Sequence, residues 1–306
     1  MRLVFAGTPE AAVPSLAALA GSDHELAAVL TRADAPTGRR RVLTASPVAA
    51  VAEERGIPTI RANRLDDAVT ERIAAMQPDL GVIVAYGGLL REPLLSTPRH
   101  GWINLHFSLL PRWRGAAPVQ RAVIAGDELT GAAVFQLEQG LDTGPVFATL
   151  SRRIGIRDTA GDLLAALAGD GAQLLLSVVD GIAAGTAEAV PQEGEPTLAP
   201  KLTLDDGRLD WSATAVALDA RVRGTTPEPG AFTVVAGQRL KVLEALPAGG
   251  AESLPPGTLA LVDRRVLAGT GSSPLELVTV QPAGKRAMPA ADWWRGLGDT
   301  EGLVAE

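Results

Sequence analysis

Residues 80–87 read LGVIVAYG, and this uninterrupted apolar run decides the fold class. A strand with one face in water alternates apolar and polar residues, whereas a parallel strand that is covered on both faces is apolar throughout. The run IPTI at residues 57–60 has the same character, and LDDAVTERIAAM at residues 65–76 has the pattern of a helix. These segments predict two strands of a parallel sheet that are covered on both faces and joined by a helix, so the sheet is expected in the interior.

The same alternation extends upstream to the first residues. Strand-like and helix-like segments follow one another as RLVFAG (2–7), AAVPSLAALAG (11–21), ELAAVLT (25–31) and SPVAAVAEERG (46–56). The last has clear ends, because Ser46 is a typical N-cap, Pro47 suits the first helical position and Gly56 suits the C-terminal stop. We therefore expect an α/β domain at the N-terminus.

The pattern changes from about Gly101 onward. Two strand-like segments, GWINLH (101–106) and GAAVFQLE (131–138), flank the helix-like PVQRAVIAG, and a longer helix is expected over 159–182. The next segment is aperiodic and rich in Pro, Gly and charge, and short β-like runs between Gly/Pro turns follow it. We predict a first domain over 1–185, a linker over 186–207 and a small β-barrel over 208–306.

Composition narrows the class of protein. The chain has 306 residues, 46% hydrophobic and 21% charged, and no apolar run approaches the roughly 20 residues of a membrane-spanning helix. There is no cysteine, and the three histidines show no metal-ligand spacing. We expect a protein of the cytoplasm without a metal or a membrane partner.

Charge gives a mixed indication about nucleic acid. The net charge of -7 disfavours indiscriminate nucleic-acid binding. A local basic patch nevertheless occurs in TRADAPTGRRR at residues 31–41, where four arginines accompany one aspartate. Such a run is either a solvated loop or a phosphate-binding loop.

The glycine turn after the first strand, AGTPE at residues 6–10, resembles part of a dinucleotide-binding site. The full fingerprint needs glycines two and five positions further on, and Gly7 has neither. An oxidoreductase that uses a dinucleotide is therefore disfavoured.

Asn104 and His106 end the strand at residues 101–106. Residues two apart in a strand point to the same face, so both side chains would enter one site at the carboxyl end of a parallel strand. Asn offers an amide donor, and His can donate to an oxyanion or move a proton near neutral pH. A single histidine at a strand end is nevertheless more often structural.

The residues that follow strengthen the catalytic interpretation. The tight apolar turn SLLP, Ser108 to Pro111, leaves backbone groups available to a flat heterocycle. The next segment, WRGAAPVQ, adds the aromatic face of a tryptophan and the guanidinium of an arginine, which can donate two parallel hydrogen bonds. Asp142 lies in GLDTG (140–144), where it is either an ordinary turn residue or the carboxylate that polarises His106 and fixes its tautomer.

Asn104, His106, SLLP and Asp142, in that order, resemble the folate-dependent formyltransferases. The longer motifs MRLVFAGTPE, SPV at 46–48, LLPRWRGAAPVQ and AGKRAMPAADWWRG at 283–296 extend the resemblance over nearly the whole chain, and they are similar to the members of the family that act on tRNA. The resemblance implies a Rossmann-like catalytic domain followed by a smaller OB-like β-barrel that assists tRNA binding.

It also implies the substrates and the site. The formyl donor would be 10-formyltetrahydrofolate, and the acceptor would be the α-amino group of methionine on initiator tRNA. The implied catalytic residues are Asn104, His106 and Asp142. The implied folate contacts are Ser108, Leu109, Leu110, Pro111 and Leu90, and the implied tRNA contacts are Arg39, Arg40 and Arg41. We expect a monomer.

Two alternatives remain open at this point. A formyltransferase that acts on a nucleotide-linked amino sugar would share the three catalytic residues. A catalytically idle RNA-binding or nucleotide-binding protein could use the same α/β scaffold, because fold alone does not determine function.

Overall fold

The computed structural model describes residues 1–37, 41–298 and 300–306. The chain forms two compact units, and neither is continuous in sequence. Unit 1 comprises Met1–Pro118, Thr130–Arg152 and Leu164–Ala199, and unit 2 comprises Val119–Leu129, Arg153–Leu163 and Pro200–Glu306. We describe each unit by itself.

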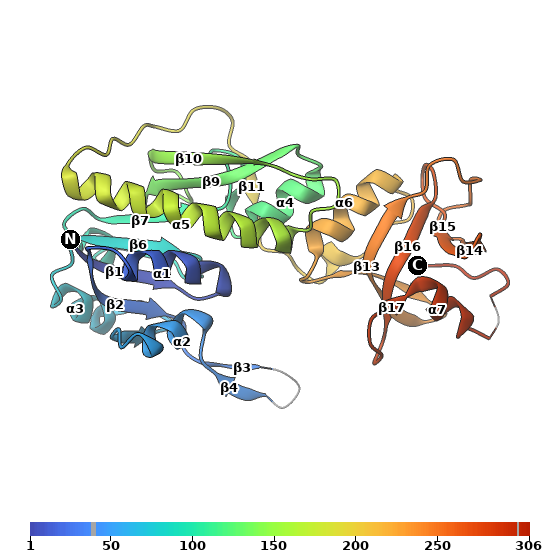
Figure 1. Ribbon diagram of the computed structural model, residues 1–306, viewed down its shortest axis with the longest axis horizontal. Coiled ribbons are helices and arrows are strands. Elements are labelled where there is room, and N and C mark those ends of the chain that lie inside the picture. The colour runs from blue at the N-terminus through green and yellow to red at the C-terminus, as the bar shows by residue number, and fades with distance from the viewer. Residues whose placement is uncertain (38–40, 299) are drawn as a thin grey trace. The chain divides into compact units, whose positions relative to one another are not determined.

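Unit 1 is built on a seven-stranded sheet in the order β10-β9-β7-β6-β1-β2-β5 (Figure 1). Strands β5, β2, β1, β6 and β7 pair in parallel, and β9 joins β7 antiparallel. The chain first extends the sheet from β1 to one side and then returns to the other, so the topological switch lies between β1 and β6. The bounds are β1 Arg2–Gly7, β2 Glu25–Thr31, β5 Thr59–Arg61, β6 Leu80–Val84, β7 Trp102–His106, β9 Leu129–Gln136 and β10 Val146–Arg153.

The predicted parallel sheet is confirmed, with one correction at its edge. All five residues of β6 are buried, as the continuous apolar run requires. The run IPTI was expected to be covered on both faces, but only Ile60 of its strand β5 is fully buried, and β5 lies at the end of the sheet. Thr59 is half-buried there and Arg61 is exposed, because an edge strand has a neighbour on one side only. Arg61 forms ion pairs with Asp34 and Glu53.

The helices of unit 1 begin and end where local chemistry places them. The side chain of Ser46 accepts a hydrogen bond from the Ala49 N–H at 3.0 Å, and Pro47 starts the helix. After the helix, Gly56 has φ +68, a left-handed conformation that glycine adopts without strain. The bounds are α1 Val13–Ala20, α2 Pro47–Glu54, α3 Asp67–Ala74 and α5 Ala160–Ala184, whose first residues, to Leu163, belong to unit 2. Helix α4, Pro118–Ala125, belongs to unit 2 after Pro118.

Helix α5 is an exception to the expectation that no apolar run approaches the length of a membrane-spanning helix. Among the described residues it is the one helix long and apolar enough, by length and composition alone, to cross a membrane. The core helix of a soluble protein passes the same test, and α5 lies against β7, where a Cβ at Gly171 would be 3.1 Å from Leu105 Cδ2.

The segment predicted as a linker contains ordered contacts with unit 1. Strand β11 (Leu198–Ala199) pairs in parallel with β8 (Arg114–Gly115). A Cβ at Gly115 would lie 2.7 Å from the Ala199 carbonyl oxygen, so this close pairing requires glycine. Residues up to Ala199 belong to unit 1, and the predicted domain limits stay a prediction.

Unit 2 contains an antiparallel sheet in the order β12-β13-β16-β15-β14, with β17 paired to β16. Residues 303–306 bridge its two edge strands, since Glu306 exchanges hydrogen bonds with Val234 of β12 and Leu303 accepts one from Leu259 of β14. The C-terminal residues thus curl the sheet, which confirms the expected OB-like barrel. The bounds are α6 Ala215–Thr225, β12 Ala231–Val235, β13 Gln238–Pro247, β14 Leu259–Val262, β15 Arg265–Ala268, β16 Leu275–Pro282, β17 Met288–Pro289 and α7 Ala290–Arg295.

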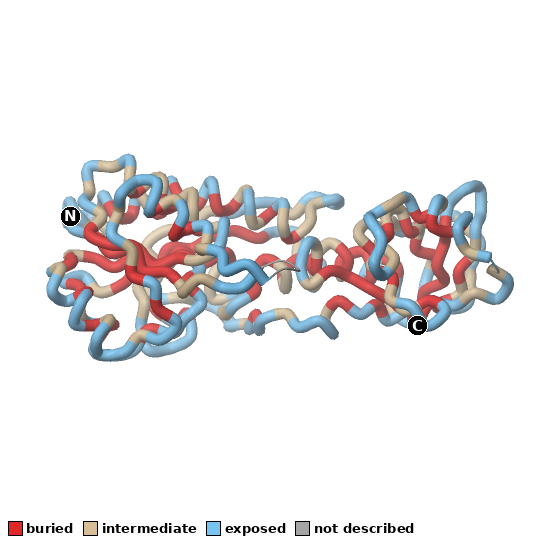
Figure 2. The backbone as a smooth tube through the Cα atoms, turned by 90° about the horizontal axis from the view of Figure 1, so that it is seen from below, coloured by how far each residue is buried: buried red, intermediate tan, exposed pale blue. Residues whose placement is uncertain are grey.

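Each unit has its own buried interior, and Figure 2 shows buried stretches within both. In unit 1, one apolar cluster includes Val4, Ile83, Leu94 and Trp102. In unit 2, Trp211, Trp293 and Trp294 pack with the apolar faces of α6 and the sheet. The tryptophans near the C-terminus therefore belong to a core.

Candidate active site

The site lies at the carboxyl end of β7, beside the switch point of the sheet. Asn104 pairs with Ile83 of β6 and Phe135 of β9, and His106 pairs with Ala133 of β9. Asn104 is half-buried, and its side chain has no hydrogen-bond partner among residues 1–37, 41–298 and 300–306. Its amide is therefore available to a ligand in a position where α/β sheets commonly bind one.

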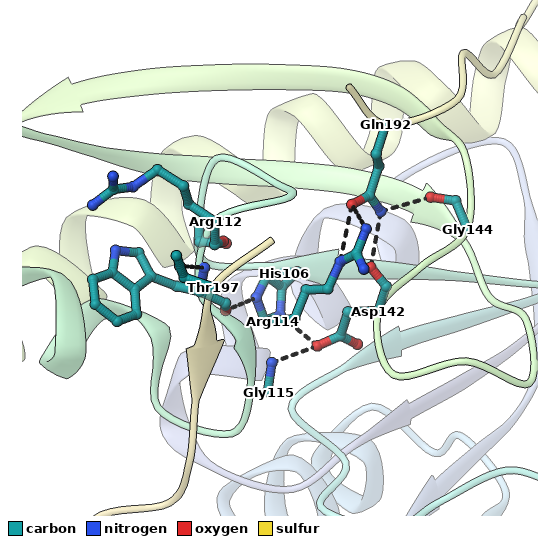
Figure 3. Close-up of polar contacts among 10 residues, drawn as sticks. His106, Arg112, Arg114, Gly115, Asp142, Gly144, Gln192 and Thr197 are labelled. Atoms are coloured by element: carbon teal, nitrogen blue, oxygen red, sulfur yellow. Dashed lines mark hydrogen bonds and ion pairs between the residues drawn. The ribbon is translucent and has the colours of Figure 1, made fainter. Parts of the chain in front are cut away.

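His106 is 6% exposed, and its two ring nitrogens face different protein groups (Figure 3). Nε2 lies 2.8 Å from the Trp113 carbonyl oxygen, and Nδ1 lies 3.7 Å from Asp142 Oδ2. A carbonyl oxygen can only accept, so Nε2 must carry a hydrogen. In the neutral ring, Nδ1 then turns its lone pair toward Asp142.

This arrangement differs from the expected role of Asp142. The Trp113 carbonyl, rather than the carboxylate, fixes the tautomer of the resting imidazole, because 3.7 Å is too long for a hydrogen bond. Burial lowers the pKa of His106 below its ordinary value of 6.5, and the charge of Asp142 opposes that shift. Asp142 is therefore placed to stabilise an imidazolium when His106 takes up a proton.

Asp142 is itself held in an unusual backbone conformation. It is 9% exposed and has φ +51, in the left-handed region that residues other than glycine seldom adopt. Its Oδ2 accepts a hydrogen bond from the Gly115 N–H at 2.8 Å. The pairing of β8 with β11 thus positions the donor that orients the carboxylate.

The SLLP turn lies directly after the strand. The Ser108 hydroxyl donates to the Arg112 carbonyl at 2.6 Å, so it serves to close the turn. Leu109, Leu110 and Pro111 are half-buried and keep partly exposed surfaces. As folate contacts these residues stay a prediction.

Leu90 lies deeper than a binding-site wall would. It is 5% exposed and packs in the apolar cluster with Tyr86, Leu94 and Leu95. Its side chain is part of the core that supports the loop after β6, so little of it is free to contact a ligand.

A pocket of about 290 Å³ opens beside that loop. Arg32, Arg64 and Arg91 line it together with Tyr86 and Leu89. The Arg32 guanidinium donates to the Asn63 carbonyl at 2.8 Å and lies 5.9 Å from the centre of the Tyr86 ring. Three of its lining residues are arginines, so the surroundings of this pocket are positively charged.

The basic loop is only partly described. Arg39 and Arg40 lie outside the described residues, whereas Arg41 is exposed and has φ +50. It precedes β4 (Val42–Thr44), which pairs antiparallel with β3 (Ala35–Thr37). Within the described residues, no three His, Cys, Asp or Glu side chains form a group that could hold a metal ion.

Two residues of the predicted linker belong to the site, and sequence reasoning missed both. Gln192 contacts the loop that carries Asp142, and the Thr197 hydroxyl accepts a hydrogen bond from the Trp113 N–H at 2.9 Å (Figure 3). These contacts join residues 50 and 84 positions apart. Local periodicity carries no signal for pairs so distant in the chain.

Comparison with known proteins identifies the family. Residues 1–179 match the formyl transferase family, and residues 201–298 match the formyl transferase C-terminal domain. The methionyl-tRNA formyltransferase of Clavibacter sepedonicus is 66% identical over 305 residues, and the alignment covers 100% of both chains.

Solved structures with low sequence identity share the fold. An N-formyltransferase from Helicobacter canadensis, in complex with folinic acid and dTDP-3-aminofucose, has a TM-score of 0.69 at 16% identity, over 92% of this chain and 98% of its own. HypX from Aquifex aeolicus, in complex with tetrahydrofolic acid, has a TM-score of 0.60 at 16% identity, over 95% of this chain and 46% of HypX. This chain thus spans about half the length of HypX. The chain belongs to the formyl transferase family, among the methionyl-tRNA formyltransferases.

Proposed function

We propose that this protein is a one-carbon transferase that moves the formyl group of 10-formyltetrahydrofolate to the α-amino group of methionine on initiator tRNA, for translation initiation. The 66% identity to a methionyl-tRNA formyltransferase over the full chain supports the acceptor. The observation that carries the chemistry is the available Asn104 amide beside the buried His106 and Asp142.

The acceptor needs little activation. A free α-amino group has a pKa of about 7.7 to 8, so an appreciable share is already neutral near physiological pH. Attack of this amine forms the new C–N bond and places negative charge on the formyl oxygen. The demanding task is to stabilise that oxyanion, and in other enzymes the loss of one such donor costs roughly 2.7 to 4 kcal/mol.

Asn104 and His106 perform that task. The Asn104 amide donates to the oxyanion from the carboxyl end of β7. The Nε2–H of His106, which rests on the Trp113 carbonyl, donates to the same oxygen once the formyl group replaces that carbonyl as acceptor. Catalytic hydrogen bonds often form only in the substrate complex.

His106 also transfers the proton. The amine loses a proton as the bond forms, and the folate nitrogen gains one as its C–N bond breaks. His106 carries the proton between them, and Asp142, with Oδ2 3.7 Å from Nδ1, stabilises the transient imidazolium. To take the amine's proton on Nε2, the neutral ring must hold its other hydrogen on Nδ1 toward Asp142 once substrate displaces the Trp113 carbonyl. The Nε2–H that then faces the oxyanion is the one gained from the amine, and it passes to the folate nitrogen.

The donor is the folate substrate, and it supplies the activated formyl group. Ser108, Leu109, Leu110 and Pro111 form the turn beside the site, and Leu90 supports the loop after β6. No metal takes part in the proposed reaction.

Arg39, Arg40 and Arg41 bind the acceptor stem of tRNA. The planar fork of arginine binds phosphate in a bidentate manner and stacks on exposed bases. The barrel of unit 2 assists with further phosphate contacts. We propose that the enzyme acts as a monomer in the cytoplasm, without a membrane partner.

An acceptor panel tests this function. Formyl-labelled 10-formyltetrahydrofolate is incubated with the protein and, in parallel, initiator Met-tRNA, uncharged initiator tRNA, elongator Met-tRNA and an amino-sugar nucleotide. Label on initiator Met-tRNA alone is the expected result. Label on the sugar alone would favour the amino-sugar alternative, which the full-length identity to a methionyl-tRNA formyltransferase does not favour; no transfer to any acceptor would support the idle-scaffold alternative.

A further inference from the structure

We infer that Gln192 is a positioning residue for formyl transfer, and that its side-chain amide holds the loop Gly140–Gly144 so that Asp142 faces His106. The inference rests on the proposed function. It assigns a role in the active site to a residue outside the strands and turns that carry the reacting groups.

The Gln192 amide uses all of its hydrogen-bonding capacity at this one place. Its Nε2 donates to the carbonyl oxygens of Asp142 and Gly144, each at 2.8 Å. Its Oε1 accepts from Arg114 Nε at 3.2 Å and from Arg114 Nη2 at 2.6 Å. Two donors and two acceptor sites are the inventory of a glutamine amide, and a carboxylate of the same shape offers no donor.

Arg114 also determines which way the amide points. A guanidinium only donates, so it selects the oxygen of Gln192 and turns the nitrogen toward the loop (Figure 3). Arg114 is next to Gly115, whose N–H donates to Asp142 Oδ2. The backbone and the carboxylate of Asp142 are thus fixed by neighbouring parts of one network.

The loop needs such support because its conformation is intrinsically unfavourable. Asp142 has φ +51, a left-handed conformation that costs an L-residue free energy, although aspartate tolerates it better than most. Gln192 contacts the carbonyls of Asp142 itself and of Gly144, two residues later. Without these bonds the loop can relax, and Asp142 then moves away from Nδ1 of His106.

The same segment fixes the other side of the imidazole. Thr197, five residues after Gln192, accepts a hydrogen bond from the Trp113 N–H, and the Trp113 carbonyl receives the Nε2–H of His106. Both neighbours of the His106 ring are therefore anchored from residues 192–197. This explains why a segment without regular periodicity is ordered against the site.

Gln192→Glu tests whether the Gln192 amide positions the Asp142 loop or only fills space beside it. The variant keeps the length of the side chain and the acceptor for Arg114, but it turns an oxygen toward the two loop carbonyls. A displacement of about 1 Å at a reacting group can cost on the order of 100-fold in rate. We expect kcat for formylation of initiator Met-tRNA to fall 10-fold to about 100-fold, while the KM values for donor and tRNA stay within about threefold.

The control is Glu193→Ala, which removes the neighbouring exposed side chain and should leave kcat unchanged. A double-mutant cycle with Asp142→Asn tests whether Gln192 acts through Asp142. If it does, Gln192→Glu adds little to the loss already caused by Asp142→Asn, whereas multiplying losses would contradict the inference.

The experiment distinguishes failure of the Gln192 inference from failure of the proposed function. Wild-type protein that formylates initiator Met-tRNA supports the function, and a Gln192→Glu variant within threefold of its kcat then overturns the inference alone. A wild type without this activity overturns the function and, with it, the catalytic role of Gln192.

A second readout does not depend on turnover and covers the case in which Gln192→Glu folds poorly. The chain has three histidines, so the ring resonances of His106 can be assigned by NMR with His106→Gln. Gln192→Ala and Arg114→Ala, checked for an unchanged melting temperature, should both shift these resonances, because both release the Asp142 loop. Resonances identical to those of the wild type in both variants would refute the positioning role.

Discussion

Replacement of Asp142 by asparagine removes one negative charge beside His106 and keeps the shape of the side chain. The carboxylate oxygen Oδ2 lies 3.7 Å from Nδ1 and accepts a hydrogen bond from the Gly115 N–H. An amide oxygen can retain the bond to Gly115, so the loop is expected to keep its conformation. Asp142→Asn therefore isolates the effect of the charge on proton transfer.

The size of the effect follows from the distance. Two unit charges 3.7 Å apart attract by about 4 kcal/mol at an effective dielectric constant of about 20. A proton that is half transferred in the transition state would gain about half of this, or about 2 kcal/mol. The expected loss in rate lies between about 30-fold and about 1,000-fold, since each 1.36 kcal/mol is about tenfold.

The assay is single-turnover formylation of initiator Met-tRNA with saturating 10-formyltetrahydrofolate, which reports the chemical step without product release. KM for both substrates should stay near that of the wild type. The control is Asp180→Asn, because Asp180 forms another histidine–carboxylate pair, with His24 at 2.9 Å. That variant should react at the wild-type rate. An Asp142→Asn rate within threefold of wild type would refute the stabilisation of an imidazolium.

Three further predictions concern RNA binding, pH and packing. Arg39→Ala should raise KM for initiator tRNA and lower the salt slope of binding by about 0.7 to 0.9; an unchanged KM at two salt concentrations would contradict the loop assignment. Because burial lowers the pKa of His106, the unfolded chain binds more protons than the folded chain at pH values just below the ordinary pKa of 6.5. The free energy of unfolding should therefore fall as pH drops below 6.5. Urea unfolding at several pH values should show that this free energy falls less steeply with pH in His106→Gln than in the wild type. Equal slopes in the two proteins would contradict a lowered pKa of His106. Gly81→Ala should cost about 3 kcal/mol by calorimetry, because a Cβ there overlaps the indole of fully buried Trp102; a wild-type melting temperature would show that the core can yield.

The fold was predictable where the deciding signal is local. The apolar run at residues 80–84 becomes the buried strand β6, and Ser46, Pro47 and Gly56 mark the helix between them as expected. The edge position of β5 was not predictable, because its sequence has the same apolar character as an interior strand. Closure of the barrel by residues 303–306 depends on pairing between distant segments, which no local pattern encodes.

The site was predictable to a similar extent. The two-residue spacing of Asn104 and His106 places them at the end of one strand, and Asp142 lies beside His106. The carbonyl of Trp113 and the amide of Gln192 were missed because both act across turns whose geometry appears only in three dimensions. A glutamine in a Pro/Gly-rich segment looks like any solvated residue until its partners are known.

The most direct test of the central claim is the single-turnover rate of formyl transfer to initiator Met-tRNA by Asn104→Ala. Asn104 offers an amide that has no partner among the described residues, and we assign it to the oxyanion. The predicted result is a loss of about 100-fold to 1,000-fold in rate with unchanged binding of both substrates. A rate within threefold of wild type would show that the oxyanion is stabilised elsewhere and would contradict the account.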